Sequence, residues 1–485
     1  MSHMRYLQQF SGGVCRRGFI LSGLAASCVA CSPAARRVRP ALRFGVASDI
    51  HVSDGGTKAI RYEKALRLFK RRGADAVMVC GDLADWGTVD SLVHVRDAWR
   101  RVFDGTQTVP LLCTGNHDFE GWFYGDMAIE MHAMGHSEDE AAVKETGGMK
   151  AVWERVFGEE YAPMRLRTVK GYDFVSAEYV GEDGKNRPDV ATFIAAHAKR
   201  LRDSDKPFFF FQHLPVKGTT PESGCGDGRL LPLLKGFPNV IAFTGHTHRP
   251  FVDERQIWQG GFTSICVPSL AHPSFPFGHE NGSTPRRDGS AVNAMPSIPA
   301  RRDLEGTQVL FVNVYADKIV IERLDVEADG AEAACPWVVP LDGVQPFAPD
   351  EAARRIPVPS FPPGADVQCE IRNTENRQGK CMVVMMCEFP SAIVPDGWRV
   401  FDYEIRAVPK DGSPPLVKKF LSPAYHKMPS CEPSRQRFWF NAADLPQDKD
   451  YIIEVRACNC FGKASPPIVA KRVFHGRPGL WKVRQ

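Results

Sequence analysis

The sequence lacks the features that would point to a membrane-spanning protein or a nucleic-acid binder. No apolar stretch in the 485-residue chain reaches the about 18 residues that a membrane-spanning helix needs. The formal net charge is only +4, and no stripe interleaves basic with aromatic residues. A nuclease therefore has little support, and no nucleic-acid partner is expected. With 43% apolar and 24% charged residues, the composition is that of a soluble globular protein.

The first 39 residues differ in kind from the rest. Arg16–Arg17 precedes an apolar run from Phe19 to Ala30, and small residues follow. This order predicts an export signal and resembles a twin-arginine signal, so we expect a periplasmic or cell-surface protein. A short core helix is the weaker alternative, because the run has no amphipathic period. Cys28 or Cys31 could carry a lipid anchor, and simple cleavage is the other possibility.

Cysteine is common, with 14 residues, and gathers toward the C-terminal end. In an oxidising compartment this clustering permits disulfides, although the sequence cannot give their pairing. The clustered residues are Cys369, Cys381, Cys387, Cys431, Cys458 and Cys460. Cys80 and Cys113 each end an apolar run, which predicts buried thiols that pack as small apolar side chains.

The chain is too long for one ordinary hydrophobic core, so we expect two folded domains with short extra segments. From residue 42 onward, short apolar runs alternate with amphipathic stretches. Strands are predicted at 42–48, 74–80 and 109–115, and helices at 59–73 and 91–103. Strand and helix in alternation is typical of an α/β domain with parallel strands, which we place at residues 40–330.

The later part of this domain is predicted to contain more strands. They lie at 172–180, 207–212, 239–245 and 262–269, with a hairpin at 308–326 that turns at Ala316 and Asp317. Residues 120–160 are less regular and rich in Met, His, Glu and Gly. We interpret them as an insertion with helical pieces, such as a lid over a site.

A second texture begins near residue 331. Residues 331–364 are rich in proline and lack a period, which predicts a linker. Only short alternating runs follow, so residues 365–485 are predicted to form an all-β immunoglobulin-like sandwich with a tail. The stretch 444–465 resembles the sixth-strand region of a fibronectin type III domain, with Tyr451 as its tyrosine-corner residue. This domain shows no evident catalytic residue, and we expect a spacer, a wall of the cleft, or a contact for protein or carbohydrate.

Polar side chains follow five of the predicted strands of the first domain. In order, they are Asp49 and His51, Asp82 and Asp85, Asn116 and His117, His213, and His246 and His248. In an α/β sheet, ligands bind beyond the carboxyl ends of the strands, so these side chains are expected to converge. Each motif alone is an ordinary turn, but five in succession predict a shared site.

These residue types suit metal ions such as Zn, Fe or Mn, because imidazole and carboxylate are their usual ligands. The pairs Asp49 with His51 and His246 with His248 are two residues apart. That spacing directs both side chains of a strand-end pair to one side. The donors are too many for one tetrahedral ion, so two ions sharing one carboxylate is the economical prediction.

The order Asp-x-His, Gly-Asp, Gly-Asn-His-Asp, His, Gly-His-x-His, spanning residues 49–248, resembles the calcineurin-like metallophosphoesterases, with no ligand position missing. The resemblance implies a four-layer αββα fold and two divalent or trivalent metal ions, with Mn, Fe, Zn and Co all open. It implies a first metal site formed by Asp49, His51, Asp82 and His248. It implies a second metal site formed by Asp82, Asn116, His213 and His246, with Asp82 bridging.

The resemblance also implies a mechanism. Two metals ~4 Å apart can hold a hydroxide between them, which attacks phosphorus in line with the leaving oxygen. His117 would stabilise the phosphoryl oxygens or protonate the leaving group, and Asp85 would orient His117. Purple acid phosphatases carry tyrosine where Asp85 stands, and Ser/Thr protein phosphatases carry arginine where Trp86 stands, so neither activity is expected.

The substrate class remains open at this stage. A small-molecule phosphate ester is expected, and monoesters, diesters, nucleotides and phospholipid headgroups all remain candidates. Arg249 could contact phosphate or simply be exposed, and Phe119 with residues 122–124 could line a cleft. The alternative function is an exported binding or scaffold protein that keeps the fold. A scaffold would be expected to lose metal ligands, whereas this sequence retains them all.

Overall fold

The computed structural model describes most of the chain between Arg39 and His475. The described residues are 39–53, 56, 58–119, 148–179, 189–202, 204–274, 276, 278–280, 307–375, 381–425, 433–441, 444–445, 449–471 and 473–475. The expected export signal, Cys28, Cys31 and residues 120–147 of the expected insertion lie outside these ranges. Among the described residues, no helix combines the length and apolar character needed to cross a membrane.

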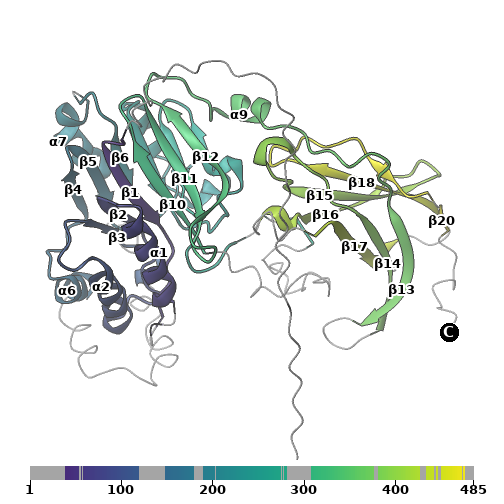
Figure 1. Ribbon diagram of the computed structural model, residues 1–485, viewed down its shortest axis with the longest axis horizontal. Coiled ribbons are helices and arrows are strands. Elements are labelled where there is room, and N and C mark those ends of the chain that lie inside the picture. The colour runs from purple at the N-terminus through teal and green to yellow at the C-terminus, as the bar shows by residue number, and fades with distance from the viewer. Residues whose placement is uncertain are drawn as a thin grey trace, which may run out of the picture. The chain divides into compact units, whose positions relative to one another are not determined.

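The first part of the chain contains two six-stranded sheets (Figure 1). Sheet 1 has the strand order β12-β11-β10-β1-β2-β3. Its strands are β1 (Leu42–Ala47), β2 (Ala76–Cys80), β3 (Val109–Cys113), β10 (Gln308–Val314), β11 (Lys318–Asp325) and β12 (Ala331–Pro340). Strands β1, β2 and β3 are parallel, whereas β10 pairs antiparallel with β1 and continues into the expected hairpin with β11.

Sheet 2 has the strand order β4-β5-β6-β7-β9-β8. Its strands are β4 (Met164–Val169), β5 (Tyr172–Ala177), β6 (Phe208–Phe211), β7 (Val240–Thr244), β8 (Ile257–Gln259) and β9 (Thr263–Cys266). Strands β5, β6, β7 and β9 are parallel to one another, and the edge strands β4 and β8 are antiparallel. The carboxyl ends of the central parallel strands therefore meet along one edge of the sheet.

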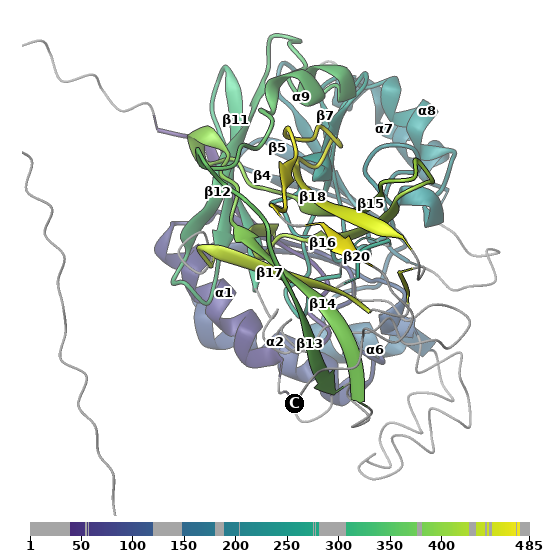
Figure 2. The same cartoon turned by 90° about the vertical axis from the view of Figure 1, so that its right-hand side faces the viewer.

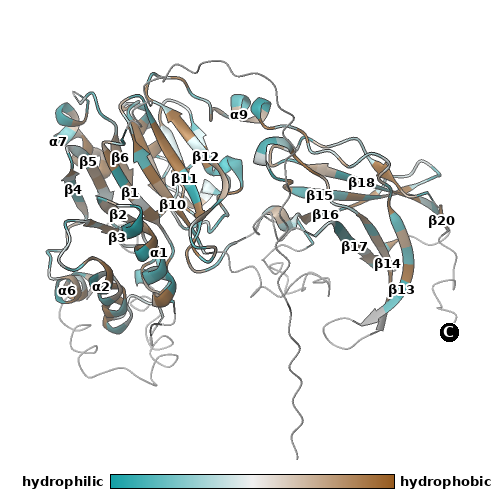
Figure 3. Cartoon of the chain, viewed as in Figure 1, coloured by the Kyte–Doolittle hydropathy of each residue, from teal (hydrophilic) through white to brown (hydrophobic). Residues whose placement is uncertain are grey.

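Strand β6 shows how the sequence builds the layers. Phe209 and Phe211 pack between the two sheets, and Phe208 and Phe210 pack on the opposite face of sheet 2. Successive side chains of a strand point to opposite faces, so an unbroken apolar run must be buried on both. Each buried phenylalanine stabilises the fold by roughly 1.5–3 kcal/mol. In the hydropathy colouring of Figure 3, brown segments occur along the strands of both sheets, with teal segments among them.

Helices cover the outer face of each sheet, which gives the four layers that the sequence predicted. Helices α1 (Ala59–Arg71), α2 (Val89–Phe103) and α6 (Gly148–Phe157) share a hydrophobic cluster with sheet 1. Helices α7 (Val190–Arg202) and α8 (Leu230–Lys235) share another with sheet 2. Figure 2 shows α7 and α8 together, and α1, α2 and α6 grouped apart from them. The predicted αββα fold is confirmed.

The local sequence explains why the helices begin and face as they do. In α1 the predicted stripe is buried, including Tyr62, Leu66 and Phe69. Helix α2 begins after Thr88, whose side chain accepts a hydrogen bond from the backbone N–H of Ser91. Such a cap satisfies a donor that would otherwise have no partner in the first turn, and stabilises a helix by about 1 kcal/mol.

The linker prediction was wrong for residues 331–340. These residues form β12, whose Ala333, Trp337 and Val339 side chains are buried in the core between the sheets. The prolines at 336 and 340 hid the alternation, but an edge strand tolerates proline because one side of it makes no ladder hydrogen bonds. A short helix, α9 (Pro349–Arg355), also lies within the expected linker. Strand β4 was not predicted from the sequence.

The C-terminal region is all β, as predicted. One sheet has the order β13-β14-β17 and the other β16-β15-β18-β19, with β20 pairing β18. The strands are β13 (Gln368–Glu375), β14 (Cys381–Pro390), β15 (Asp402–Pro409), β16 (Leu416–Leu421), β17 (Arg435–Asn441), β18 (Asp450–Cys458), β19 (Ile468–Val469) and β20 (Phe474–His475). Tyr451 is buried in their shared core, and Asn459 Oδ1 accepts from the backbone N–H groups of Phe461 and Lys463 in the following turn. The fibronectin type III assignment itself stays a prediction.

Residues 40–485 form one compact unit. Phe401 and Tyr425 of the β region belong to the same hydrophobic cluster as the core between the two α/β sheets. The hydroxyl of Tyr425 lies 3.3 Å from Asp253 Oδ2, and His279 Nε2 lies 2.8 Å from Asp402 Oδ2. The sandwich therefore has a core of its own and also contacts the α/β part through buried polar groups.

Nine cysteines whose side chains the structure describes are free, namely Cys80, Cys113, Cys225, Cys266, Cys335, Cys369, Cys387, Cys458 and Cys460. Cys80 and Cys113 are buried as expected, and burial raises the pKa of both thiols. The Sγ atoms of Cys369 and Cys387, which face each other across β13 and β14, lie 3.5 Å apart. Of the clustered cysteines, the four with described side chains, Cys369, Cys387, Cys458 and Cys460, are free thiols.

Glu178, just after β5, connects the two sheets beside the end of β3. Its Oε2 accepts hydrogen bonds from the backbone N–H and the hydroxyl of Thr114, at 2.7 and 2.9 Å. Arg165 Nη2 lies 3.7 Å from its Oε1. Burial raises the pKa of Glu178, and although Arg165 and Thr114 lower it, the net pKa is about 7 instead of 4.5.

Because of this raised pKa, the stability of the protein is expected to depend on pH. Glu178→Gln is expected to reduce that pH dependence. Between pH 4.5 and about 7 the folded protein keeps a proton that the unfolded chain has released, so stability falls as pH rises through this window. The full effect is about 3 kcal/mol. Denaturant unfolding from pH 4 to 8 should give a curve for the variant that is flatter by that amount. Parallel curves would contradict the prediction.

Candidate metal centre

The predicted site residues come from the carboxyl ends of five strands in both sheets. Asp49 and His51 follow β1, Asp82 follows β2, Asn116 follows β3, His213 follows β6, and His246 and His248 follow β7. Strands β1 to β3 belong to sheet 1, whereas β6 and β7 belong to sheet 2. The packing of the two sheets brings together side chains that are up to 199 positions apart in the sequence, from Asp49 to His248.

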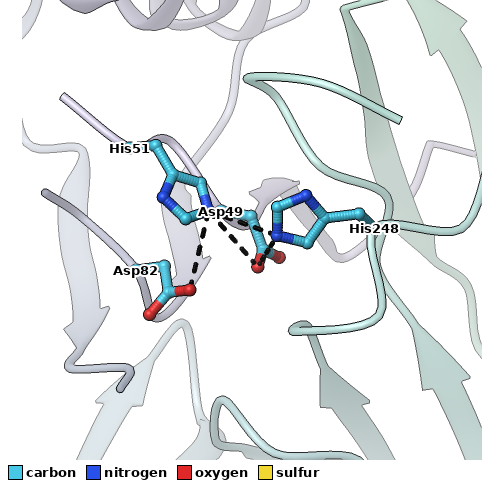
Figure 4. A group of neighbouring side chains, drawn as sticks. All are labelled: Asp49, His51, Asp82 and His248. Atoms are coloured by element: carbon cyan, nitrogen blue, oxygen red, sulfur yellow. Dashed lines mark hydrogen bonds and ion pairs between the residues drawn. The ribbon is translucent and has the colours of Figure 1, made fainter. Parts of the chain in front are cut away.

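A first group consists of Asp49, His51, Asp82 and His248, whose ligand atoms all lie within 4.8 Å of one another (Figure 4). His248 Nε2 is 2.9 Å from Asp49 Oδ1, and His51 Nε2 is 3.2 Å from His248 Nε2. Two ring nitrogens that face each other at this distance cannot both carry a proton without repulsion. The arrangement instead directs two lone pairs and two carboxylates toward one point.

A second group shares Asp82 with the first and adds His213 and His246, again within 4.8 Å. The side-chain oxygen of Asn116 lies 3.0 Å from both His213 Nε2 and His246 Nδ1. His213 Nε2 is 3.1 Å from Asp82 Oδ2. The two groups therefore overlap at one carboxylate, as the metallophosphoesterase resemblance implied.

The donor atoms fit a pair of metal ions. Asp82 Oδ2 is buried without a hydrogen bond of normal geometry, although His213 Nε2 lies 3.1 Å away and His51 Nε2 3.6 Å away. An unsatisfied buried carboxylate oxygen is costly unless a cation binds it. The set contains nitrogen and oxygen donors only, which suits Mn, Fe, Zn or Co.

The carboxylates and histidines of the site shift one another's pKa values. Burial raises the pKa of Asp82, but His213 and His51 outweigh it and bring the pKa to about 2. Burial lowers the pKa of His213, but Asp82 and Asp49 raise it to about 9. Burial and the charge of His213 lower the pKa of His246 to about 4. The carboxylates are thus ionised at neutral pH and need positive charge beside them, which bound cations would supply.

The backbone at the site is held in an unfavourable conformation. Nine described non-glycine residues have positive φ, and five of them are implied metal ligands. They are Asp49 (52°), His51 (52°), Asp82 (50°), His246 (74°) and His248 (54°). Such residues cost of order 1–3 kcal/mol each and persist only where the surrounding structure fixes them. The packing of the strands therefore imposes these positive φ values, which the local sequence does not favour.

The family model of calcineurin-like phosphoesterases matches residues 42–250, which contain both groups of donors. By this match, residues 42–250 are similar to a calcineurin-like phosphoesterase domain. The sheets of this phosphoesterase domain continue beyond the matched residues, because β10, β11 and β12 complete sheet 1.

Solved structures resemble the chain at low identity, and each alignment covers 62% of it. A predicted phosphoesterase from Streptococcus pneumoniae has 10% identity, 97% coverage of that chain and a TM-score of 0.27. A purple acid phosphatase from yellow lupin seeds has 14% identity, 53% coverage and a TM-score of 0.36. Vacuolar Protein Sorting 29 from Cryptosporidium parvum has 9% identity, 96% coverage and a TM-score of 0.25. No curated protein matches the chain.

The two predicted catalytic residues, Asp85 and His117, lie at the edge of the first group. A carboxylate oxygen of Asp85 and ring nitrogens of His117 and His51 all lie within 4.8 Å of one another. The expected role of Asp85 in orienting His117 stays a prediction, and its Oδ1 also lies 2.9 Å from His51 Nδ1. Lys58 Nζ binds the same carboxylate at 3.1 and 3.3 Å. The backbone carbonyl of Asp85 lies 3.4 Å from His117 Nδ1. Asp85 therefore fixes the ring of the implied metal ligand His51, because its carboxylate lies within hydrogen-bond distance of Nδ1.

His117 contacts the metal-site residues through its backbone and its ring. Its N–H donates to Asp82 Oδ1 at 2.9 Å, and its ring centroid lies 4.6 Å from that of His51. The ring is partly exposed. It thus sits beside the donor groups without belonging to the first or second metal site.

Asp118 is a site residue to which the sequence reasoning gave no role, although it is the last letter of the Gly-Asn-His-Asp motif. It is fully buried, and its carboxylate accepts from the backbone N–H groups of Leu83, Ala84 and Gly115. It therefore joins the turn that carries Asp82 to the turn that carries Asn116. The signal for this role in the sequence was an acidic residue at the end of a short motif that begins with glycine.

Arg249 is buried, which excludes the exposed alternative. Its guanidinium bonds the carboxylate of Glu222, and its Nη1 has no hydrogen-bond partner. Phe119 contacts Tyr179, with ring centroids 5.9 Å apart. Residues 122–124, expected to line a cleft, lie outside the described residues.

The Asp85 contact predicts that Asp85→Asn weakens metal binding. A carboxylate accepts the Nδ1 proton of His51 and leaves Nε2 free to bind a metal, whereas an amide can also donate and favour the wrong tautomer. We expect the affinity of one ion to fall by about 10-fold or more. Titration with Mn²⁺ measures it, with Asp97→Asn on α2 as the control. Equal affinities in the variant and the wild type would refute this role.

Proposed function

We propose that this protein hydrolyses phosphate esters with two metal ions. The observation that carries the proposal is the overlap of two complete donor groups at one buried carboxylate, Asp82, inside a calcineurin-like phosphoesterase domain. When bound, two cations would polarise phosphoryl oxygens and activate a water molecule for attack on phosphorus.

The chain's own residues would supply the rest of the chemistry. His117 is partly exposed next to His51, so it is the imidazole that can approach a phosphoryl oxygen or the leaving oxygen. Asp82 holds the backbone of His117 through the 2.9 Å hydrogen bond. Asp85 and Lys58 would keep the ring of His51 in register with the first metal site. Each of these roles is inferred from a contact that holds a side chain in place beside the metal donors.

The proposed substrate is a small-molecule phosphate monoester or diester. The groups facing the site are metal donors and imidazoles, which recognise the phosphoryl group that all such esters share. The buried Arg249 pairs with Glu222, so it is not assigned to substrate recognition.

Metal content and ester hydrolysis, measured together, test the proposal. The wild type is expected to contain about two metal ions per chain and to hydrolyse aryl phosphate monoesters or diesters. Asp82→Ala removes the shared ligand and should lose both metals and activity. Asp97→Ala, at a partly exposed position on α2, is the control.

A wild type that remains metal-free and inactive with added Mn, Zn, Fe or Co would refute this function and favour the scaffold alternative. The ratio of monoester to diester rates would narrow the substrate class.

We also propose export by the twin-arginine route, on the sequence of Arg16–Arg17 and the apolar run after it. This route transports folded proteins, so the metals could bind before export. Replacing both arginines with lysine is expected to block export, measured by fractionation of cells. Unchanged export of the lysine variant would refute this route.

A further inference from the structure

The loop after β9 contacts the first metal site from outside every motif considered above. We call residues 267–274 the β9 loop. It follows a strand of sheet 2 that is parallel to β7, so it leaves the sheet at the same edge as His246 and His248. The backbone N–H of Val267 donates to Thr244 O, which fixes the start of the loop beside the end of β7.

Ser269 is the centre of this loop. Its side chain is buried, and its hydroxyl donates to the carbonyl of Asp49 at 3.1 Å. The same oxygen accepts from the backbone N–H groups of Ala271 and His272, at 3.1 and 3.2 Å. One donor and two acceptor positions are all that a hydroxyl has, so its hydrogen bonding is complete.

The turn that Ser269 closes holds His248. The carbonyl of His272 lies 3.1 Å from His248 Nδ1, and the backbone N–H of Ser274 donates to His248 O at 2.8 Å. A carbonyl next to Nδ1 accepts its proton, so Nε2 keeps its lone pair and faces Asp49. The ring orientation of His248 therefore depends on a turn 20 residues or more downstream.

The same loop holds Asp49. Its carbonyl accepts from Ala271 N at 3.1 Å as well as from Ser269 Oγ, and Leu270 N donates to Ser48 O at 2.9 Å. Asp49 and His248 both have left-handed backbones, with φ of 52° and 54°. Residues in that conformation need external restraint, and the β9 loop supplies it to both.

The second metal site is oriented by a different group. His213 Nδ1 faces the carbonyl of Cys80, the last residue of β2, at 2.9 Å. Ser264, on β9 itself, is buried like Ser269 but contacts the hydroxyl of Thr219. The chain thus offers two buried serines five positions apart, of which one is bonded to a metal-site residue.

We propose that Ser269 is a positioning residue for the first metal site, holding Asp49 and His248 in the geometry that binds a metal ion. The inference rests on the proposed function only in requiring that the site binds metal. It predicts that loss of the hydroxyl lowers the binding affinity for one of the two ions and leaves the affinity for the other nearly unchanged.

The test is Mn²⁺ binding by the full-length, metal-stripped protein, with free Mn²⁺ followed by electron paramagnetic resonance. Ser269→Ala is expected to bind one ion about 10–100-fold more weakly than the wild type and the other with nearly unchanged affinity. Ser264→Ala is the matched control and should bind both ions as the wild type does. Ser269→Thr keeps the hydroxyl and should recover most of the lost affinity.

Circular dichroism and melting in EDTA show whether each variant is folded. If Ser269→Ala is unfolded, Ser269→Cys replaces it, because a thiol is a similar size but a weak hydrogen-bond donor. Wild-type affinity for both ions in the folded variant would overturn the role of Ser269 alone. An equal loss at both ions would also overturn it, because that pattern indicates general damage. A wild type that binds two ions but hydrolyses no ester would defeat the proposed function and leave this inference standing.

Discussion

The carboxylate of Asp82 lies where the two donor groups overlap, and the rest of the site is arranged around it. It is buried, it has one oxygen without a normal hydrogen bond, and it lies close to histidines from both sheets. Such a group is unfavourable in a protein interior unless positive charge accompanies it. The αββα packing forces Asp82 into this position, so the fold carries an electrostatic cost that bound cations would relieve.

That cost is matched by a backbone cost. Five implied ligands have left-handed φ values, and each would relax if the surrounding turns allowed it. Buried groups outside the ligand set oppose that relaxation. Asp118 joins the turns after β2 and β3, and the β9 loop, which Ser269 closes, joins the turns after β1 and β7. The implied ligands are therefore held by surrounding hydrogen bonds, and these in turn are supported by the apolar cores of the two sheets.

The β-sandwich is more closely tied to the α/β part than a domain on a flexible spacer would be. Phe401 and Tyr425 share a hydrophobic cluster with the sheets, and Tyr425 contacts Asp253, five residues after His248. Much of the expected linker is ordered structure, because β12 supplies the edge of sheet 1. Through these contacts the sandwich supports the segment that follows His248, the last implied metal ligand.

The sequence by itself predicted most of the elements around the site and the candidate metal donors, although it missed β4 and β12. Apolar periodicity is a local property, so α1, α2 and the central strands could be predicted from short windows, and the polar residues at the strand ends could be read directly. Only the tertiary structure decided which of these groups meet. The carboxylate of Asp85 lies against His51 Nδ1, β12 joins the sheet despite its prolines, and Ser269 reaches Asp49 across 220 positions. Such contacts depend on how strands distant in the sequence pack, and no local pattern records that.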